Sequence, residues 1–256
     1  MGILNVTPDS FSDGGRFLDA GAAWEQACRM VEEGADILDI GGESTRPGAQ
    51  PVSEAEELRR VAPIVERAAG LRAAVSIDTT KPTVANACLA RGAKIINDIS
   101  GFGDPAMTEV ARRHHAACIA MHMRGTPETM QSLTDYRDVV AEVKEYLAGR
   151  VSALRAAGIE DIAIDPGLGF AKTAAHNFII LRRLPELVAL GVPVLIGPSR
   201  KRFLGSLADM EPMENRRDGT VAAITAAVLS GARIIRAHDV VQARRAIAVA
   251  EAVLQA

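Results

Sequence analysis

The sequence of 256 residues has little of several features that would define a functional class. Aromatic residues make up only 4% of it, and 29 Lys and Arg against 32 Asp and Glu leave a formal net charge of −3. Such a chain lacks both the basic excess and the aromatic rings that general nucleic-acid binding requires. Hydrophobic residues nevertheless account for 48% of the sequence, and this content with so low a net charge excludes intrinsic disorder.

Redox and targeting signals are equally sparse. The three cysteines, Cys28, Cys88 and Cys118, lie far apart in apolar sequence, which favours buried thiols over a disulfide framework or a zinc site. The longest apolar runs, such as AAITAAVL at residues 222–229, are much shorter than the roughly 18 residues that a membrane span needs. The opening MGILNVTPDS has neither the basic segment nor the apolar stretch of a signal peptide. We therefore expect a cytoplasmic protein with no membrane partner.

What the sequence does contain is a regular alternation of apolar runs and helical segments. Continuous apolar character is typical of parallel strands that are buried on both faces. Eight such runs occur: GILNV, ADILDI, AAVSID, AKIIND, ACIAMH, IAIDPG, VPVLIG and ARIIRA. Helical spacing occurs at residues 22–33, 53–69, 82–91, 105–115, 136–157, 177–190, 214–229 and 240–254. The second helical segment opens with Ser53-Glu54-Ala55-Glu56, which predicts a capping box.

Eight strands that alternate with eight helices in about 250 residues predict an α/β fold, the (β/α)8 TIM barrel. We expect a single domain over residues 1–256 that starts at the first barrel strand, because no linker or low-complexity tract interrupts the pattern. A doubly wound open sheet is the alternative. It needs a glycine-rich phosphate turn after its first strand, and the sequence has none there.

The active site of such a barrel lies at the carboxyl ends of its strands. Almost every apolar run here ends in a polar or charged side chain. These residues are Asn5, Asp39 ahead of the loop GGESTRPGA, Asp78, Asn97, His122, Asp165, Ser199 to Arg202, and Arg236 with His238. One or two polar strand ends would indicate only contact with water, whereas so many that converge on one face predict a binding site. His122 is the exception, because its side chain could either line the pocket or pack in the core.

Ordered motifs after the strands resemble those of one known family. They are ILNVTPDSFSDGG, DIGGESTRPGA, SIDTTKP, INDISG, MHMRGTPETMQ, DPGLGF, SRKRFLG and RAHDV, and they extend from Met1 to the last strand. Together they resemble the dihydropteroate synthase family. The resemblance implies a transferase of folate biosynthesis that joins 6-hydroxymethyl-7,8-dihydropterin diphosphate to 4-aminobenzoate and releases diphosphate. It also implies a target of sulfonamide drugs and a homodimer.

Members of that family usually carry a short leader before the first strand. Here Met1 begins the strand itself. We therefore expect either a start that is placed too late or a barrel floor that is unusually open.

The resemblance assigns pterin binding and catalysis to Asp78, Asn97, Asp165 and Lys201. A carboxylate such as Asp165 can accept the two parallel N–H groups of a pterin in charge-assisted hydrogen bonds. Asp78 and Asn97 would serve the remaining ring nitrogens, since an amide offers a donor and an acceptor. Taken by itself, Asn97 could equally be a residue that only caps the end of its strand. Lys201 would contact the pterin carbonyl and offset charge near the reacting carbon.

The diphosphate has its own candidate ligands, which are Asn5, Thr45, Arg46, Arg236 and His238. The last two precede a helix that begins near Asp239, and helix N-termini are the usual phosphate site of this barrel. Asn5 offers a hard amide oxygen, and the resemblance places it on Mg2+ bound to the diphosphate.

The 4-aminobenzoate would be held by four residues, two at its carboxylate and two beside its ring. The carboxylate would be met by Ser199 and Arg202, and the ring would be flanked by Pro47 and Phe170. No Ser-His-Asp or Cys-His arrangement supplies a nucleophile, and the substrate brings its own amine. We therefore predict a dissociative substitution, in which the C–O bond to the diphosphate ionises first.

Two other functions remain as alternatives. A pterin-binding methyltransferase uses a similar barrel but has no diphosphate to hold, so the loop DSFSDGG, Arg236 and His238 argue against it. A non-catalytic barrel that binds pterin or anions would have broken polar strand ends, and here they are intact. The stretch GLGFAKT from Gly167 resembles a phosphate-binding loop, but the Walker A motif has glycine where Ala171 stands.

Overall fold

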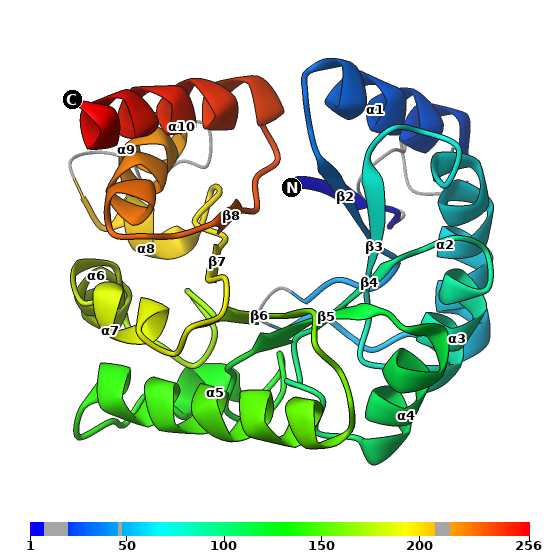
Figure 1. Ribbon diagram of the computed structural model, residues 1–256, viewed down its shortest axis with the longest axis horizontal. Helices are drawn as coiled ribbons and strands as arrows, with labels where there is room; N and C mark the ends of the chain where they lie inside the picture. The colour runs from blue at the N-terminus through cyan, green and yellow to red at the C-terminus, as the bar shows by residue number, and fades with distance from the viewer. Residues whose placement is uncertain (8–19, 46–47, 208–215) are drawn as a thin grey trace.

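Helices surround a central ring of strands in the computed structural model (Figure 1). It describes residues 1–7, 20–45, 48–207 and 216–256. The strands are β1 (Gly2–Asn5), β2 (Ile37–Gly41), β3 (Ala74–Asp78), β4 (Ile95–Asp98), β5 (Ala117–Met121), β6 (Ile162–Asp165), β7 (Leu195–Ile196) and β8 (Ile234–Ile235). The longer helices are α1 (Ala20–Glu32), α2 (Glu54–Ala68), α3 (Pro82–Leu89), α4 (Pro105–His114), α5 (Val139–Ala156), α6 (Ala174–Arg182), α9 (Arg216–Leu229) and α10 (Val240–Gln255).

The strands form a closed parallel barrel. β1 to β6 pair in sequential order, and β7 pairs with β8. Two isolated bridges join these sheets, one between Ile164 and Val194 and one between Gly2 and Ala237. The second is reinforced because the Ile3 amide donates to the Ala237 carbonyl at 3.0 Å. The predicted α/β barrel is confirmed, and its first and last strands meet.

The element boundaries depart from the prediction in two places. The helix predicted over 177–190 is two helices, α6 and α7 (Pro185–Val188), because Pro185 has no N–H to continue the hydrogen bonding of α6. Two short helices were not predicted at all, η1 (Met130–Ser132) and α8 (Arg202–Gly205). Three or four residues are too few to display a helical period.

The capping box predicted at the start of α2 is only half formed. The Ser53 hydroxyl accepts a hydrogen bond from the Glu56 amide at 3.2 Å, as expected. The Glu56 carboxylate, however, binds Arg59 at 2.8 Å and Arg60 at 2.7 Å instead of turning back to the cap, because two cations in the following turn attract it more strongly than one amide. A complete capping box occurs at Thr173 and His176 on α6.

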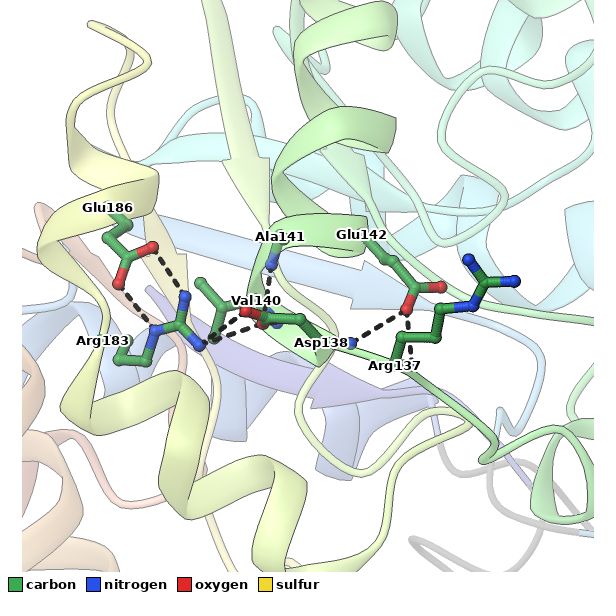
Figure 2. A network of polar contacts seen from close by, with 7 residues as sticks. All are labelled: Arg137, Asp138, Val140, Ala141, Glu142, Arg183 and Glu186. Atoms are coloured by element: carbon green, nitrogen blue, oxygen red, sulfur yellow. Dashed lines mark hydrogen bonds and ion pairs between the residues drawn. The ribbon is translucent and has the colours of Figure 1, made fainter.

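A salt-bridge network ties α5 to α6 and α7 on the outside of the barrel (Figure 2). The Asp138 carboxylate caps α5 by accepting from the amides of Val140 and Ala141 at 2.9 and 3.1 Å. The same carboxylate pairs with the Arg183 guanidinium at 3.0 Å. Arg183 also binds Glu186 on α7 at 2.7 and 2.9 Å. One arginine thus holds the start of α5 and the junction of α6 and α7 together.

The barrel has two apolar regions with different roles. The main core lies between the strands and the helices, and a second, small cluster consists of Ile119, Ala163 and Leu195 with Met1, Ile95 and Ile234 packed against them. Side chains alternate between the two faces of a strand. The residues two positions beyond Ile95, Ala163 and Ile234 therefore point into the barrel as well, above this cluster.

Those residues are Asn97, Asp165 and Arg236. The alternation therefore places the predicted binding residues at the mouth of the barrel, directly above the small apolar cluster. No helix in the described part of the chain is both long and apolar enough to cross a membrane.

Candidate active site

A buried ion-pair network crosses the mouth of the barrel. The Arg236 guanidinium, which follows β8, donates from Nε to Asp39 Oδ2 at 2.6 Å and from Nη2 to Asp78 Oδ2 at 2.7 Å. Asp39 Oδ2 also accepts from Asn97 Nδ2 at 3.0 Å. Residues of β2, β3 and β4 are thereby connected to the end of β8, so the three predicted residues of this group lie together.

Asp39 is the member of this network to which the sequence prediction gave no binding role. It is 0% exposed, and its Oδ1 has no hydrogen-bond partner among the described residues. The sequence did carry a signal for this role, because Asp39 lies inside β2, two residues before its last residue Gly41. A carboxylate on the inward face of a strand is costly unless it is paired. Asp39 therefore acts on the site through Asn97 and Arg236.

Arg236 is only partly available to a phosphate in this arrangement. Two of the five N–H donors of its guanidinium are committed to Asp39 and Asp78. Asp39 and Asp78 raise the pKa of the arginine against the opposing effect of burial. Burial raises the pKa of Asp78 to about 7, a shift that Arg236 opposes and Asp39 adds to. Two carboxylates around one guanidinium leave this part of the mouth rich in negative charge.

Asp165 lies at the end of β6 and is held by the turn that follows it. It is 6% exposed, and its Oδ1 accepts a hydrogen bond from the Gly167 amide at 2.7 Å. Gly167 has φ = +69°, and a Cβ there would overlap the carbonyl oxygen of His122, so only glycine fits. Burial raises the pKa of Asp165, while Lys201 and the Gly167 amide lower it.

Lys201 and Phe170 meet beside Asp165. The Lys201 ammonium donates to the Leu168 carbonyl and lies 4.8 Å from the centroid of the Phe170 ring, within cation–π range. Burial lowers the pKa of Lys201 to about 8, and Asp165 opposes this shift. The structure therefore brings together one residue predicted for the pterin and one predicted for the 4-aminobenzoate ring.

Ser199 and His238 form a further pair. The Ser199 hydroxyl lies 3.0 Å from His238 Nδ1 and accepts from the His238 amide at 3.2 Å. The sequence prediction gave them to different substrates, whereas here they are neighbours at the start of α10. Asp239 caps that helix by accepting from the Gln242 amide at 3.1 Å, so one of its N-terminal amides is already satisfied.

The remaining predicted residues are more scattered. Asn5 ends β1 beside Gly41, and Thr45 is half-buried in the loop after β2, while Arg202 is exposed at the first residue of α8. Arg46 and Pro47 lie outside the described residues, as does the loop DSFSDGG.

His122 and Lys172 form a buried pair behind the turn at Gly167. Lys172 Nζ lies 3.0 Å from His122 Nδ1. The His122 ring packs edge-on against Tyr146 at a centroid distance of 5.0 Å, and burial lowers the pKa of His122 to about 3. His122 therefore belongs to the packing, the second of the two possibilities left open. Nothing in the spacing of the sequence indicated that Lys172 would turn inward.

The described residues include no group of three or more His, Cys, Asp or Glu that could hold a metal ion. Magnesium is commonly held by one or two protein oxygens together with substrate phosphates and water, and a single amide oxygen at Asn5 fits that habit.

Comparison with known proteins identifies the family. A family model described as "Pterin binding enzyme" matches residues 1–238. Dihydropteroate synthase from a Synechocystis species is 50% identical over 244 residues, which cover 94% of this chain and 84% of the relative.

Solved structures agree with this relationship. Dihydropteroate synthase from Xanthomonas albilineans with 4-aminobenzoic acid superposes with a TM-score of 0.93 at 46% identity, covering 100% of this chain and 92% of that one. The same enzyme in complex with 7,8-dihydropteroate has a TM-score of 0.89 at 43% identity, covering 100% and 93%. The chain therefore belongs to the pterin-binding enzymes, in the dihydropteroate synthase family.

Proposed function

We propose that this transferase joins 6-hydroxymethyl-7,8-dihydropterin diphosphate to 4-aminobenzoate, giving 7,8-dihydropteroate and diphosphate. The observation that supports this most is that Asp165 and Asn97, both buried, and the nearly buried Asp78 lie above an apolar barrel floor. A heterocycle with several N–H donors is the ligand that such carboxylates and amides would accept. The relatives with 4-aminobenzoic acid and with 7,8-dihydropteroate support the choice of substrate and product.

Asp165 would bind the pterin amide N–H and exocyclic amine. A carboxylate has about four lone-pair sites, so it can accept two pterin N–H groups in addition to that of Gly167. Asn97 donates one amide hydrogen to Asp39, which orients its side chain and keeps its carbonyl oxygen as an acceptor for the ring. Lys201 would meet the pterin carbonyl, and Asp78 would serve a ring nitrogen.

The diphosphate would lie over the loops after β1, β2 and β8. His238 would contact the diphosphate, with its ring positioned by the Ser199 hydroxyl 3.0 Å from Nδ1, and Thr45, Arg46 and Arg236 would add to this contact. Asn5 would hold Mg2+ on the diphosphate; when bound, the ion would neutralise negative charge on the leaving group.

The 4-aminobenzoate would stack beside Phe170, with Pro47 on its other side. Phe170 lies against the Lys201 ammonium, and this contact supports a ring site next to the pterin site. Ser199 and Arg202 would contact the carboxylate. The exposed position of Arg202 suits a contact at the outer end of this substrate.

The reaction would proceed by a dissociative substitution. The bond between the pterin methylene carbon and the diphosphate oxygen breaks first, and the electron pair leaves with the diphosphate. Asp78 and Asp165 stabilise the resulting pterin cation, because carboxylates that are prearranged in a protein interact strongly with charge that develops in the transition state. The amine then attacks the carbon and loses a proton. A series of ring-substituted 4-aminobenzoates tests this order: we expect the rate to depend weakly on amine basicity, and a strong first-order dependence would contradict it.

The remaining parts of the proposal concern assembly and location. A homodimer would bury the outer face of α9 and α10, where Leu229, Val249, Val253 and Leu254 are exposed. The three free cysteines, two of them buried, suit the reducing cytoplasm.

One assay tests the proposed reaction directly. The purified protein is mixed with dihydropterin diphosphate, 4-aminobenzoate and magnesium, and both diphosphate and 7,8-dihydropteroate are measured. We expect the two products in equal amounts. Formation of neither product would contradict the proposal. Methyl transfer from methyltetrahydrofolate in place of this reaction would favour the methyltransferase alternative.

A further inference from the structure

A buried lysine lies behind the pterin site and has no part in the steps above. Lys172 is 4% exposed, and lysine is almost never buried to this degree unless it is paired. Burial lowers the pKa of Lys172 to about 7, and Asp165 opposes this shift. An apolar residue of similar length would fill the same space without the cost of removing an ammonium from water.

The Lys172 ammonium connects two barrel strands. It lies 3.0 Å from His122 Nδ1 and donates to the Phe170 carbonyl at 3.0 Å, with the His122 carbonyl at 3.5 Å. An ammonium has three donors, and these three acceptors account for them. His122 follows β5 directly, whereas Phe170 lies in the turn after β6. The lysine therefore ties the end of one strand to the turn of the next.

The backbone around Lys172 is held in an unusual conformation. Ala171 is fully buried and has φ = +50°, a left-handed value that alanine rarely adopts and that often occurs at functional sites. Gly167, at the other end of the turn, packs directly on the His122 carbonyl. Both ends of the segment from Gly167 to Lys172 are thus fixed against the end of β5.

The same segment carries groups of the pterin site. The Gly167 amide binds Asp165, the Leu168 carbonyl accepts from Lys201, and the Phe170 ring contacts Lys201. A displacement of the segment would therefore move Asp165 and Lys201 together. The cations that face Asp165 are Lys201, Arg236 and Lys172, and each favours its ionised form against burial.

We propose that Lys172 is a positioning residue for pterin recognition, which holds the turn over residues 166–170 and thereby keeps the Asp165 carboxylate aimed at the pterin. This inference rests on the proposed function, because it assigns Asp165 to the pterin. Lys172 itself touches no substrate. Its effect reaches the ligand through the Gly167 amide and through its positive charge.

The variant Lys172→Met tests the inference, with Lys94→Met at an exposed lysine as the matched control. Affinity for dihydropterin diphosphate with magnesium is measured by calorimetry between pH 5 and pH 8, without 4-aminobenzoate. We expect Lys172→Met to fold, with circular dichroism as the check, and to unfold at a somewhat lower temperature because buried acceptors at His122 and Phe170 lose their donor. Its affinity should fall roughly tenfold to a hundredfold, the scale expected for a misplaced binding group. Lys94→Met should behave as the wild type.

The pH profile separates positioning from simple packing. Binding requires the Asp165 carboxylate, and loss of the Lys172 charge raises the pKa of that group. The pH below which affinity is lost should therefore rise in Lys172→Met. A packing defect alone would lower affinity equally at every pH.

Wild-type affinity and pH profile in Lys172→Met would overturn the inference. Should this variant fail to fold, His122→Phe removes one acceptor of Lys172 while it keeps a ring against Tyr146. We expect a smaller loss of affinity in the same direction, and unchanged affinity would overturn the inference by this route. Failure of the wild-type protein to bind the pterin would instead contradict the proposed function.

Discussion

Single residues at the barrel mouth are held by opposite charge. Arg236 lies between Asp39 and Asp78, and removal of one partner from such a buried pair is strongly unfavourable because it leaves an uncompensated charge. Asp39 also orients Asn97. Under the proposed function, the binding groups are fixed before the substrate arrives, so that little ordering is required on binding.

Asp165→Asn is the residue-scale prediction. The change keeps the shape of the side chain and can keep the hydrogen bond from Gly167, but it replaces an acceptor oxygen by a donor that opposes a pterin N–H. We expect pterin affinity to fall by at least about a hundredfold, since a charge-assisted bond is lost and a donor meets a donor. Calorimetry with dihydropterin diphosphate measures the affinity, and circular dichroism checks that the fold is retained.

Asp161→Asn is the matched control, because Asp161 is exposed at the opposite end of the same strand. It should bind the pterin as the wild type does. Equal pterin affinity in Asp165→Asn and in the wild type would remove Asp165 from the pterin site.

Elements are joined by networks of a different kind, at the surface. At the start of α5, Asp138 caps the helix and pairs with Arg183 (Figure 2). The amide of Ala141 and the Arg183 guanidinium lower the pKa of Asp138. A lowered folded pKa means that the carboxylate stabilises the protein above its unfolded pKa of about 4, and that this contribution disappears as the pH falls through the folded value.

Asp138→Ala should therefore lower the melting temperature at pH 7, because α5 loses its cap and Arg183 loses a partner. The difference from the wild type should shrink as the pH falls below about 4. Differential scanning calorimetry at several pH values measures it. Asp135→Ala changes the same charge at an exposed position nearby and should have little effect. A difference that stays constant with pH would show that the charge of Asp138 is irrelevant.

Among the described residues, the end of α10 carries a group of exposed apolar side chains. Val249 and Val253 are each 61% exposed and Leu254 is 60% exposed, and the first two are one helical turn apart. Apolar side chains grouped in this way are typical of protein–protein contacts. Under the proposal of a homodimer, a second copy of the chain would cover them.

Val253→Lys tests this surface at the scale of the assembly. A lysine at the centre of an apolar contact would have to be desolvated without a partner, so we expect a shift from dimer to monomer in sedimentation equilibrium. Glu251→Lys, an exposed change in the same turn, should leave the dimer intact. A wild-type protein that is monomeric at micromolar concentration would contradict the proposed dimer.

The sequence alone was sufficient for the barrel and for the family. Apolar runs without alternation predicted all eight strands, because buried parallel strands need apolar side chains on both faces. Polar residues at their carboxyl ends predicted which side chains gather at the mouth of the barrel. The elements that it missed were local: the split between α6 and α7 at Pro185, the half-formed capping box at Ser53, and the short helices η1 and α8.

The contacts within the site were decided by the tertiary structure. Arg236 and Asp39 are 197 residues apart, and Lys172 and His122 are 50 apart, so no local pattern could pair them. Their meeting depends on closure of the barrel between β8 and β1 and on the tight turn at Gly167. Sequence periodicity thus determined which side chains reach the mouth, whereas closure of the ring determined which charges neutralise one another there.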